Sequence, residues 1–440
     1  MSALKPNLPP DKKVSKSYFK IINRGSTLRL EILAGITTFL TMAYAFVLIP
    51  TLLSQGGVEF GAAMTATVLA AVFATVMAAL FANYPFALAP GVALIVYFSH
   101  VLITIEGLSW QVALGTCFLT GVVLWILTTL KLRTLLISTI PATLRIATIA
   151  GIGIFLAIVG LKNAGILVHS KNMLSFGNPS LFIPIMTAIG LVATGFLMRL
   201  KVHGAIFFGI LLIWILSAAF GKIEWHGWMA FPKSLTPTLF QLDVVGALRL
   251  ENLGLLISMI FIALFDSAAA VLALAARAGF IYKKKEGCDV QRIFVCDSTG
   301  VMLSAILGTS PIAVYLESAA GIGIGGRTGV TALVCAILFC TIPFFAPLIT
   351  SIPLYATAPA LIIIGGSMLT SIGGIKWKDV TEWIPAFLTL ILIPFTFNVS
   401  VGIGVGYITF CALKLITGRV RHIHWFTWII ALLFCLKFAL

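Results

Sequence analysis

The stretch "GTSPIAVYLESAAGIG" (residues 308–323) decides the fold, because it is apolar enough to lie within a membrane yet contains two features that a regular, uncharged membrane helix lacks. Pro311 has no N–H group, and a proline ends or kinks a helix. Glu317 places a carboxylate in hydrocarbon, at a cost of about 2.5–3.5 kcal/mol. An interrupted span that carries an acid predicts a functional site inside a membrane protein.

A second interrupted stretch, "YPFALAPGVALIVYF" (residues 84–98), has Pro85, Pro90 and Gly91 at membrane depth. Irregular backbone at that depth must be hydrogen-bonded within the protein or line a cavity. A matched pair of short spans interrupted by Gly and Pro is typical of the binding site of a secondary transporter. We therefore expect both stretches to contribute to a transporter's binding site.

The whole chain has the composition of a polytopic membrane protein. Its 440 residues are 60% hydrophobic and 10% charged, and the mean hydropathy is +1.11. Its apolar runs mostly have the length that a helix needs to cross about 30 Å of hydrocarbon. The net charge of +15 is spread over short loops, so it reports topology and does not indicate a nucleic-acid partner.

The apolar runs divide into two sets of seven expected spans. Because seven is odd, the second set begins on the opposite side of the membrane, which is the condition for an inverted repeat. The expected spans cover residues 31–52, 62–83, 86–105, 110–130, 138–160, 178–199 and 203–220, and then 251–275, 291–308, 310–322, 329–350, 354–372, 381–397 and 399–416.

The charges of the loops fix the expected orientation, since cytoplasmic loops collect Lys and Arg. With the N-terminus inside, the inner loops contain Lys131, Arg133 and the run Lys283–Lys285, whereas the outer loops hold far fewer cations. The polar N-terminus lacks the apolar core of a signal peptide. We predict a multi-pass protein of the cell (inner) membrane with a cytoplasmic N-terminus. Residues 425–440 are short for a span, and we expect them to lie in the interface or re-enter the bilayer.

Three acids lie away from the first residues of the expected spans: Asp266 in the eighth, Asp297 near the cytoplasmic end of the ninth and Glu317 in the tenth. Each acid either joins helices through hydrogen bonds or serves the function. We favour the functional interpretation for Asp266 and Glu317 and leave both open for Asp297. A carboxyl group in an apolar site can carry a proton, and a carboxylate accepts hydrogen bonds from the N–H groups of a planar heterocycle.

Gly321, Gly323 and Gly326 have the spacing of a dinucleotide-binding turn, but no strand–helix–strand unit surrounds them. We interpret them as packing and exit-turn residues of a short helix. The seven cysteines form no CxxC pair, and the six histidines lack the spacing of metal ligands. No nucleophile with a base is evident either, so we expect no cofactor, no metal and no enzymatic activity.

Five stretches together carry a resemblance to a known family. They are "GITTFLTMAY" (35–44), "LRIATIAGIGIFLAIVGLKNAGI" (144–166), "LFDS" (264–267), "GTSPIAVYLESAAGIGIGGRTGVTA" (308–332) and "TEWIPAFLTLILIPFTFNVSVGI" (381–403). The chain resembles the AzgA-like purine permeases of the nucleobase:cation symporter family from Glu31 to its C-terminus. Such proteins import hypoxanthine, guanine, adenine or xanthine.

The resemblance implies an all-α membrane fold of about fourteen spans in a seven-plus-seven inverted repeat, with short strands in the discontinuous spans 3 and 10. It also implies proton-coupled uptake by an elevator-like movement of a core domain against a gate domain. The proton gradient supplies the energy, and a homodimer is an expectation. The implied regions are a cytoplasmic tail (1–30), core spans 1–4 (31–130), gate spans 5–7 (131–221), an outer loop (222–250), core spans 8–11 (251–350) and gate spans 12–14 with the C-terminal apolar segment (351–440).

The resemblance also implies a site. Asp266 and Glu317 match the family's acids and are expected to bind the substrate and couple protons. The expected substrate-binding residues further include Thr41, Tyr315, Ser318 and Ile95.

The chain departs from the family at one of these positions. Ile95 stands where the family usually has an Asn, and Ala93 stands where it has a Gly. A missing polar partner changes discrimination between substrates, so we expect an altered preference among planar, nucleobase-like molecules. The alternatives are a permease of the same fold for another small planar or anionic substrate and an uncoupled, anion-channel-like protein.

Overall fold

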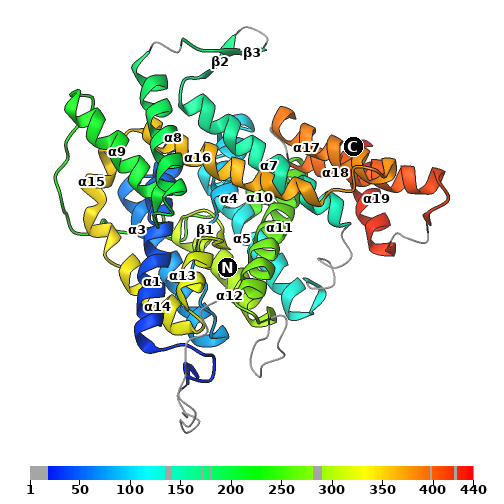
Figure 1. Cartoon of the computed structure of the whole chain (residues 1–440). Coiled ribbons are helices and arrows are strands. Elements are labelled where there is room, and N and C mark those ends of the chain that lie inside the picture. Colours follow the sequence, from blue (N-terminus) through cyan, green and yellow to red (C-terminus); the bar gives the residue numbers. More distant parts are fainter. Residues whose placement is uncertain are drawn as a thin grey trace.

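A computed structural model of the chain describes residues 18–133, 141–170, 173–178, 181–280, 290–396, 399–420 and 424–439. The expected tail up to residue 17 and the run Lys283–Lys285 lie outside the described residues, so the predictions about them stay predictions. The described chain is mostly helical, with two short antiparallel strand pairs (Figure 1). The predicted helical membrane fold is therefore confirmed.

The elements follow the expected order along the chain. The first half forms α1 (Leu28–Met42), α2 (Ala45–Gln55), α3 (Phe60–Met77), the π-helix η1 (Ala78–Ala82), β1 (Leu88–Pro90), α4 (Val92–Val96), the π-helix η2 (Tyr97–Ile105), α5 (Trp110–Thr129), α7 (Ala142–Asn163), β2 (Leu167–Ser170), β3 (Met173–Phe176), α8 (Phe182–Arg199) and α9 (Ala205–Ala219). The second half forms α10 (Val244–Ala247), η3 (Leu250–Asn252), α11 (Leu253–Arg277), α12 (Val290–Leu307), β4 (Ile312–Val314), α13 (Ser318–Ile324), α14 (Gly329–Phe339), η4 (Ile342–Phe345), α15 (Ala346–Thr350), α16 (Leu354–Leu369), η5 (Thr370–Gly374), α17 (Val380–Thr396), α18 (Val399–Ile416) and α19 (Trp425–Ala439).

These helices occupy the positions of the expected spans. Among the described residues, nine helical segments are long and apolar enough to cross a membrane, and four shorter apolar helices accompany them. Together with the short helix α13, they fill the fourteen positions expected from the sequence. The seven-plus-seven arrangement is therefore present, and α19 follows as an additional helix.

The two interrupted spans meet at the centre of the molecule (Figure 1). β1 of the third span pairs antiparallel with β4 of the tenth, so that Leu88 lies opposite Val314 and Pro90 lies opposite Ile312. The side chain of Thr75 on α3 completes the ribbon, because its hydroxyl donates to the Leu88 carbonyl at 2.9 Å and accepts from the Leu88 N–H at 3.0 Å. The backbone exposed by each break is thus hydrogen-bonded within the protein, as membrane depth requires.

The helices pack in two main sets. α7 lies against α16 and α17, α17 lies against α18, and α8 lies against α9. Around the β1–β4 ribbon, α1 packs on α13 and α14, while α12 packs on α3 and α5. The residue limits of the core and gate domains, including the outer loop at 222–250, stay predictions.

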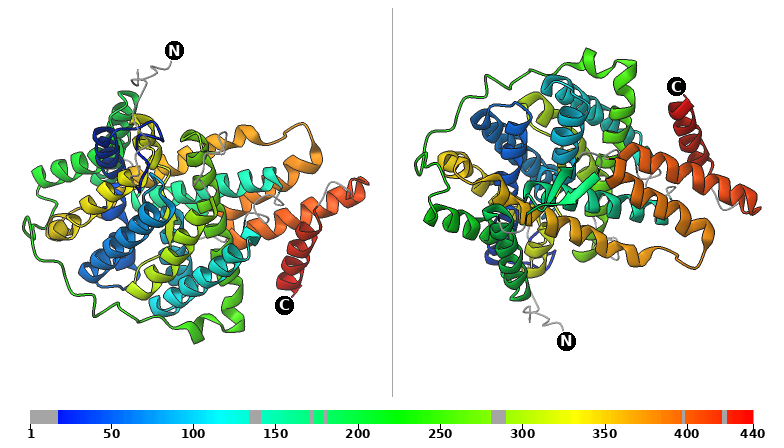
Figure 2. Two further views of the ribbon diagram at one scale, coloured as in Figure 1. Left: turned by 90° about the horizontal axis from the view of Figure 1, so that it is seen from below. Right: turned by 90° about the horizontal axis from the view of Figure 1, so that it is seen from above.

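Two peripheral features were not predicted as secondary structure. β2 and β3 form a hairpin between α7 and α8, at the top edge of Figure 1. α19 packs on α18 at one side of the molecule (Figure 2). Phe434 of α19 is 2% exposed, and its ring centroid lies 5.7 Å from that of Phe261 on α11. The C-terminal apolar segment is thus a packed helix, and its expected place in the membrane interface stays a prediction.

Candidate functional site

The β1–β4 ribbon holds the starts of two short helices side by side. α4 begins after Gly91 and continues into η2, while α13 begins after Glu317. The ribbon extends beyond its strands, because the N–H of Gly91 donates to the Pro311 carbonyl at 3.0 Å and the N–H of Tyr315 donates to the Ala87 carbonyl at 3.1 Å. The N-terminal end of a helix has free N–H groups and a partial positive charge. Polar, electron-rich groups are therefore favoured where these helices begin.

Asp266 reaches this point from α11. A Cβ atom placed on Gly91 would lie only 3.2 Å from Asp266 Oδ2, so the carboxylate lies directly against the turn between β1 and α4. Asp266 is partly exposed, and its carboxylate has no hydrogen bond from any residue in the described part of the chain. It is free to accept hydrogen bonds from a bound molecule.

Glu317 lies at the other break and has a protein partner. The hydroxyl of Tyr44 donates to Glu317 Oε1 at 2.6 Å. Tyr44 is 1% exposed and stands where the first span is itself interrupted between α1 and α2. Thr41, in the last turn of α1, is partly exposed; its hydroxyl donates to the Thr38 carbonyl at 2.8 Å and also lies 3.4 Å from the Glu317 carbonyl. The first span therefore positions the acid of the tenth.

Sequence reasoning missed Tyr44. The residue lies within the stretch that carries the family resemblance, but it is 273 residues away from Glu317. No spacing rule connects residues at such a separation. The weak signal that could have found it was a tyrosine at the middle of an apolar span, since a buried tyrosine hydroxyl usually has a hydrogen-bond partner.

Tyr315 and Ser318 use their hydroxyl groups to join the two interrupted spans. Tyr315 is 5% exposed and donates to the Pro90 carbonyl at 2.6 Å. Ser318 is completely buried, and its hydroxyl accepts the N–H of Ala87 at 3.1 Å. Both bonds tie the tenth span to the third, so these side chains hold the two halves of the site together.

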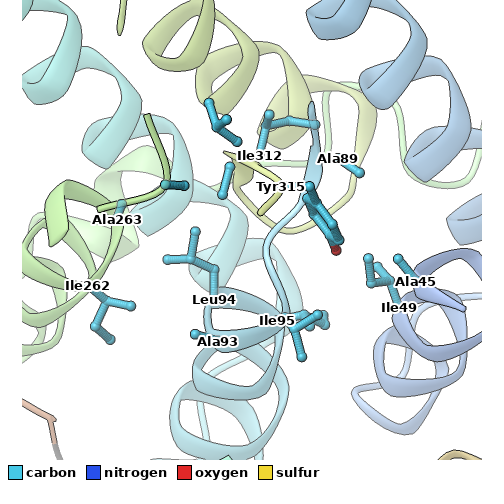
Figure 3. Packing of buried hydrophobic residues seen from close by; sticks show 14 of the residues in the cluster. Ala45, Ile49, Ala89, Ala93, Leu94, Ile95, Ile262, Ala263, Ile312 and Tyr315 are labelled. Carbon is cyan, nitrogen blue, oxygen red and sulfur yellow. The ribbon is translucent and has the colours of Figure 1, made fainter. Parts of the chain in front are cut away.

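Ile95 is completely buried on α4. Figure 3 shows it on the side of α4 that faces Ala45 and Ile49 of α2, below Tyr315. Among the predicted residues, the structure thus gives Asp266, Glu317 and Thr41 partial exposure and places Ile95, Tyr315 and Ser318 in the surrounding packing.

Asp297 has two strong partners. Arg133 Nη2 pairs with Asp297 Oδ2 at 2.6 Å, and the Ser267 hydroxyl donates to Oδ1 at 2.8 Å. Both charged side chains are completely buried, and the guanidinium also lies 4.3 Å from the centre of the Phe294 ring. Arg133 follows the fourth span as expected, but its side chain is not exposed in a loop, because it is buried in this ion pair. The geometry supports the structural interpretation of Asp297.

The glycines after Glu317 act mostly in packing. A Cβ atom on Gly321 would collide with the Thr38 hydroxyl and the Ala34 carbonyl of α1, and one on Gly326 would lie 2.8 Å from Ala34 Cβ. Gly325 has a φ of 129°, which suits the exit turn. The packing interpretation is confirmed for Gly321 and Gly326, whereas Gly323 has no comparably close neighbour. No group of metal-binding side chains occurs among the described residues.

Comparison with solved structures supports the architecture. The transmembrane domain of a cyanobacterial bicarbonate transporter, BicA, superposes with a TM-score of 0.62, covering 86% of this chain and 97% of that chain. The murine anion transporter Slc26a9 superposes with a TM-score of 0.66, covering 89% of this chain and 68% of that one. Sequence identities of 19% and 11% limit this likeness to the fold.

Sequence comparison identifies the family. The model described as "Permease family", of the xanthine/uracil permeases, matches residues 29–405. The chain is 41% identical to "Putative permease MJ0326" of Methanocaldococcus jannaschii, over 97% of this chain and 98% of the relative. It is 36% identical to adenine permease AdeQ of Escherichia coli (96% and 95% covered) and 34% identical to guanine/hypoxanthine permease PbuO of Bacillus subtilis (95% and 99% covered). The chain therefore belongs to the xanthine/uracil permease family and is a multi-pass membrane transport protein, not an enzyme.

Proposed function

We propose that this permease imports purine nucleobases together with protons across the cell (inner) membrane, by an elevator-like movement of its core domain against its gate domain. The observation that carries the proposal is the pair of partly exposed carboxylates, Asp266 and Glu317, at the two breaks joined by the β1–β4 ribbon. Relatives named adenine and guanine/hypoxanthine permeases support a purine as the substrate.

The chemistry of a purine suits this arrangement. Its ring N–H and exocyclic amino groups donate hydrogen bonds, and a carboxylate accepts them. Its ring nitrogens and carbonyl groups accept, which suits the free N–H groups where α4 begins. Leu316, beside Glu317, is 51% exposed and offers an apolar contact to the flat face of the ring.

In this proposal the predicted residues divide by role. Asp266 and Glu317 contact the substrate and carry the coupled proton, and Thr41 completes the polar edge beside Glu317. Tyr315 and Ser318 hold the ribbon that positions both acids. Ile95 lies on the side of α4 that faces α2, below Tyr315 (Figure 3), where it sets the shape and polarity of the wall of the site. The proton gradient is the energy source, and no cofactor takes part.

The experiment is uptake of labelled purines and pyrimidines in permease-deficient cells, with and without an uncoupler. We expect purines to compete, uptake to be concentrative, and the uncoupler to abolish accumulation. Asp266→Asn and Glu317→Gln should each lower uptake at least tenfold. Glu251→Gln is the matched control, because this side chain is 70% exposed and pairs only weakly with Arg249 at 3.8 Å. Normal transport by both site variants would reject the assignment, and large uncoupled currents would indicate a channel.

Ile95→Asn tests the departure from the family pattern. A buried amide without partners costs about 1–3 kcal/mol of stability, so the free variant should unfold at a lower temperature. A purine that forms hydrogen bonds with the amide should restore part of the lost unfolding temperature. It should also bind more tightly to Ile95→Asn than to the natural chain. Ile95→Leu is the control for packing alone. Unchanged purine uptake in Ile95→Asn would count against a role for this position.

A further inference from the structure

A surface pocket of about 880 Å³ lies where the loop before α17 meets the end of α18. Its lining includes three cations, Lys376, Lys378 and Arg419, together with Asp379. None of its lining residues belongs to the candidate substrate site. The pocket therefore has the size of a small-molecule site and an excess of positive charge that the transport function does not use.

The acid in the pocket is already fully used. Asp379 Oδ1 accepts the N–H of Thr381 at 3.0 Å and its hydroxyl at 2.8 Å, while Oδ2 pairs with Arg419 at 2.9 Å. The bonds from Thr381 hold the pKa of Asp379 below its usual range, so it stays ionised. Lys376 and Lys378 are exposed and have no ion pair within the described part of the chain. Both ammonium groups are free to bind an anion.

Exposed apolar side chains, here called the apolar rim, lie in the pocket at Val380 and next to its lining residue Thr417 at Leu415 and Ile416. Val380 at the start of α17 is 54% exposed, and Leu415 and Ile416 at the end of α18 are 56% and 80% exposed. Since α17 and α18 occupy the positions of expected membrane spans, we infer that these side chains face acyl chains. Trp377, 47% exposed beside the two lysines, is of the type that marks the membrane–water interface. Cations and exposed apolar side chains thus meet at the depth of lipid headgroups.

We propose that this pocket binds the phosphate headgroup of an anionic phospholipid. Lys376 and Lys378 bind the phosphate, and the acyl chains lie along Val380, Leu415 and Ile416. Basic pockets between membrane helices bind anionic headgroups in this way. A free phosphate would use the lysines but would leave the apolar rim uncovered, so the surface selects a lipid.

The test is a lipid titration of the purified, delipidated chain in detergent, read by native mass spectrometry. The probes are phosphatidylglycerol, phosphatidylcholine and inorganic phosphate. Lys376→Gln/Lys378→Gln removes both free cations and leaves the Asp379–Arg419 pair intact. Lys162→Gln/Lys222→Gln is the matched control, because it removes the same charge at two exposed lysines of the expected outer face. The readout does not involve transport, so it succeeds or fails independently of the proposed function.

Each lysine near an anionic lipid contributes about fivefold in affinity, so the double variant should bind phosphatidylglycerol about thirtyfold more weakly. The control variant should bind it like the natural chain, and phosphatidylcholine should bind weakly to all three. Equal binding of phosphatidylglycerol by both variants would overturn the proposal. Equal binding of phosphatidylcholine and phosphatidylglycerol would also overturn it, and so would displacement of the lipid by inorganic phosphate at equal concentration.

Discussion

Tyr44→Phe isolates the contact between the first span and the acid of the tenth. The substitution removes one oxygen atom and keeps the ring, so the packing of a side chain that is 1% exposed is preserved. The bond that it removes is 2.6 Å long and joins a hydroxyl to a carboxylate, within the range of charge-assisted hydrogen bonds. Such bonds contribute about 1.5–3 kcal/mol. Because Glu317 is partly exposed, water can replace part of the bond, and we use about 1.5 kcal/mol, the lower limit.

This loss should appear in substrate binding, since a mobile carboxylate must be ordered again when the purine binds. A difference of about 1.5 kcal/mol corresponds to roughly tenfold in the dissociation constant. The assay is equilibrium binding of a labelled purine to the purified protein, with KM and kcat of uptake measured beside it. We expect a dissociation constant about ten times higher, and an unfolding temperature within a few degrees of the natural chain's.

Tyr97→Phe is the control for this prediction. Tyr97 is also completely buried, but its hydroxyl donates to the neutral Leu255 carbonyl at 3.1 Å. It should change stability by about 0.5–1.5 kcal/mol and leave purine binding unchanged. Natural affinity in Tyr44→Phe, alongside lost affinity in Glu317→Gln, would refute the positioning role. An equal loss in both tyrosine variants would show that the effect is not specific to Glu317.

Two further predictions concern stability, measured by thermal unfolding in detergent. Arg133→Met leaves Asp297 buried without its cation and should lower the free energy of unfolding by about 3–5 kcal/mol. Arg133→Met/Asp297→Asn should lower it less, because no buried charge remains. Unchanged stability of the single variant would show that the ion pair is not needed. Gly365→Ala should cost about 1–3 kcal/mol, because α16 and α7 touch there and a Cβ on Gly365 would collide with the Gly153 carbonyl and lie 3.0 Å from the Ala157 nitrogen. Gly366→Ala, with no atom within 4 Å, should be neutral or stabilising, and equal effects at the two glycines would contradict this account of the packing.

Local features of the sequence were sufficient to predict the spans and the two breaks. A proline affects the hydrogen bonds of its own segment, so Pro90 and Pro311 indicated where the third and tenth spans are interrupted. The cost of a membrane acid likewise indicated Asp266 and Glu317 without any knowledge of their neighbours. Hydropathy then provided the length and number of the spans, because the thickness of the bilayer is fixed.

Contacts between distant segments were beyond the reach of such reasoning. Arg133 was assigned to a loop because it follows a span, and only the packing of α12 against α5 brings Asp297 to it. The hydroxyls of Tyr315 and Ser318 were expected to meet the substrate, which stays a prediction, and the pairing of β1 with β4 also gives them partners within the protein at Pro90 and Ala87. Sequence spacing predicts which residue types are present at a site, but the fold decides which of their polar atoms remain free.

The hydrogen bonds of Tyr315 and Ser318 limit how the third and tenth spans can move. Tyr315 and Ser318 join the third and tenth spans by side-chain bonds to Pro90 and Ala87, in addition to the backbone pairing of the ribbon. The two spans come from opposite halves of the inverted repeat. Neither span can move without the other unless several buried hydrogen bonds break, and each such bond is costly to break at membrane depth. Asp266 lies against the same ribbon. In the proposed elevator step, both acids and the half-helices must therefore move as one body. Within that body, the carboxylate of Asp266 can accept hydrogen bonds from the substrate.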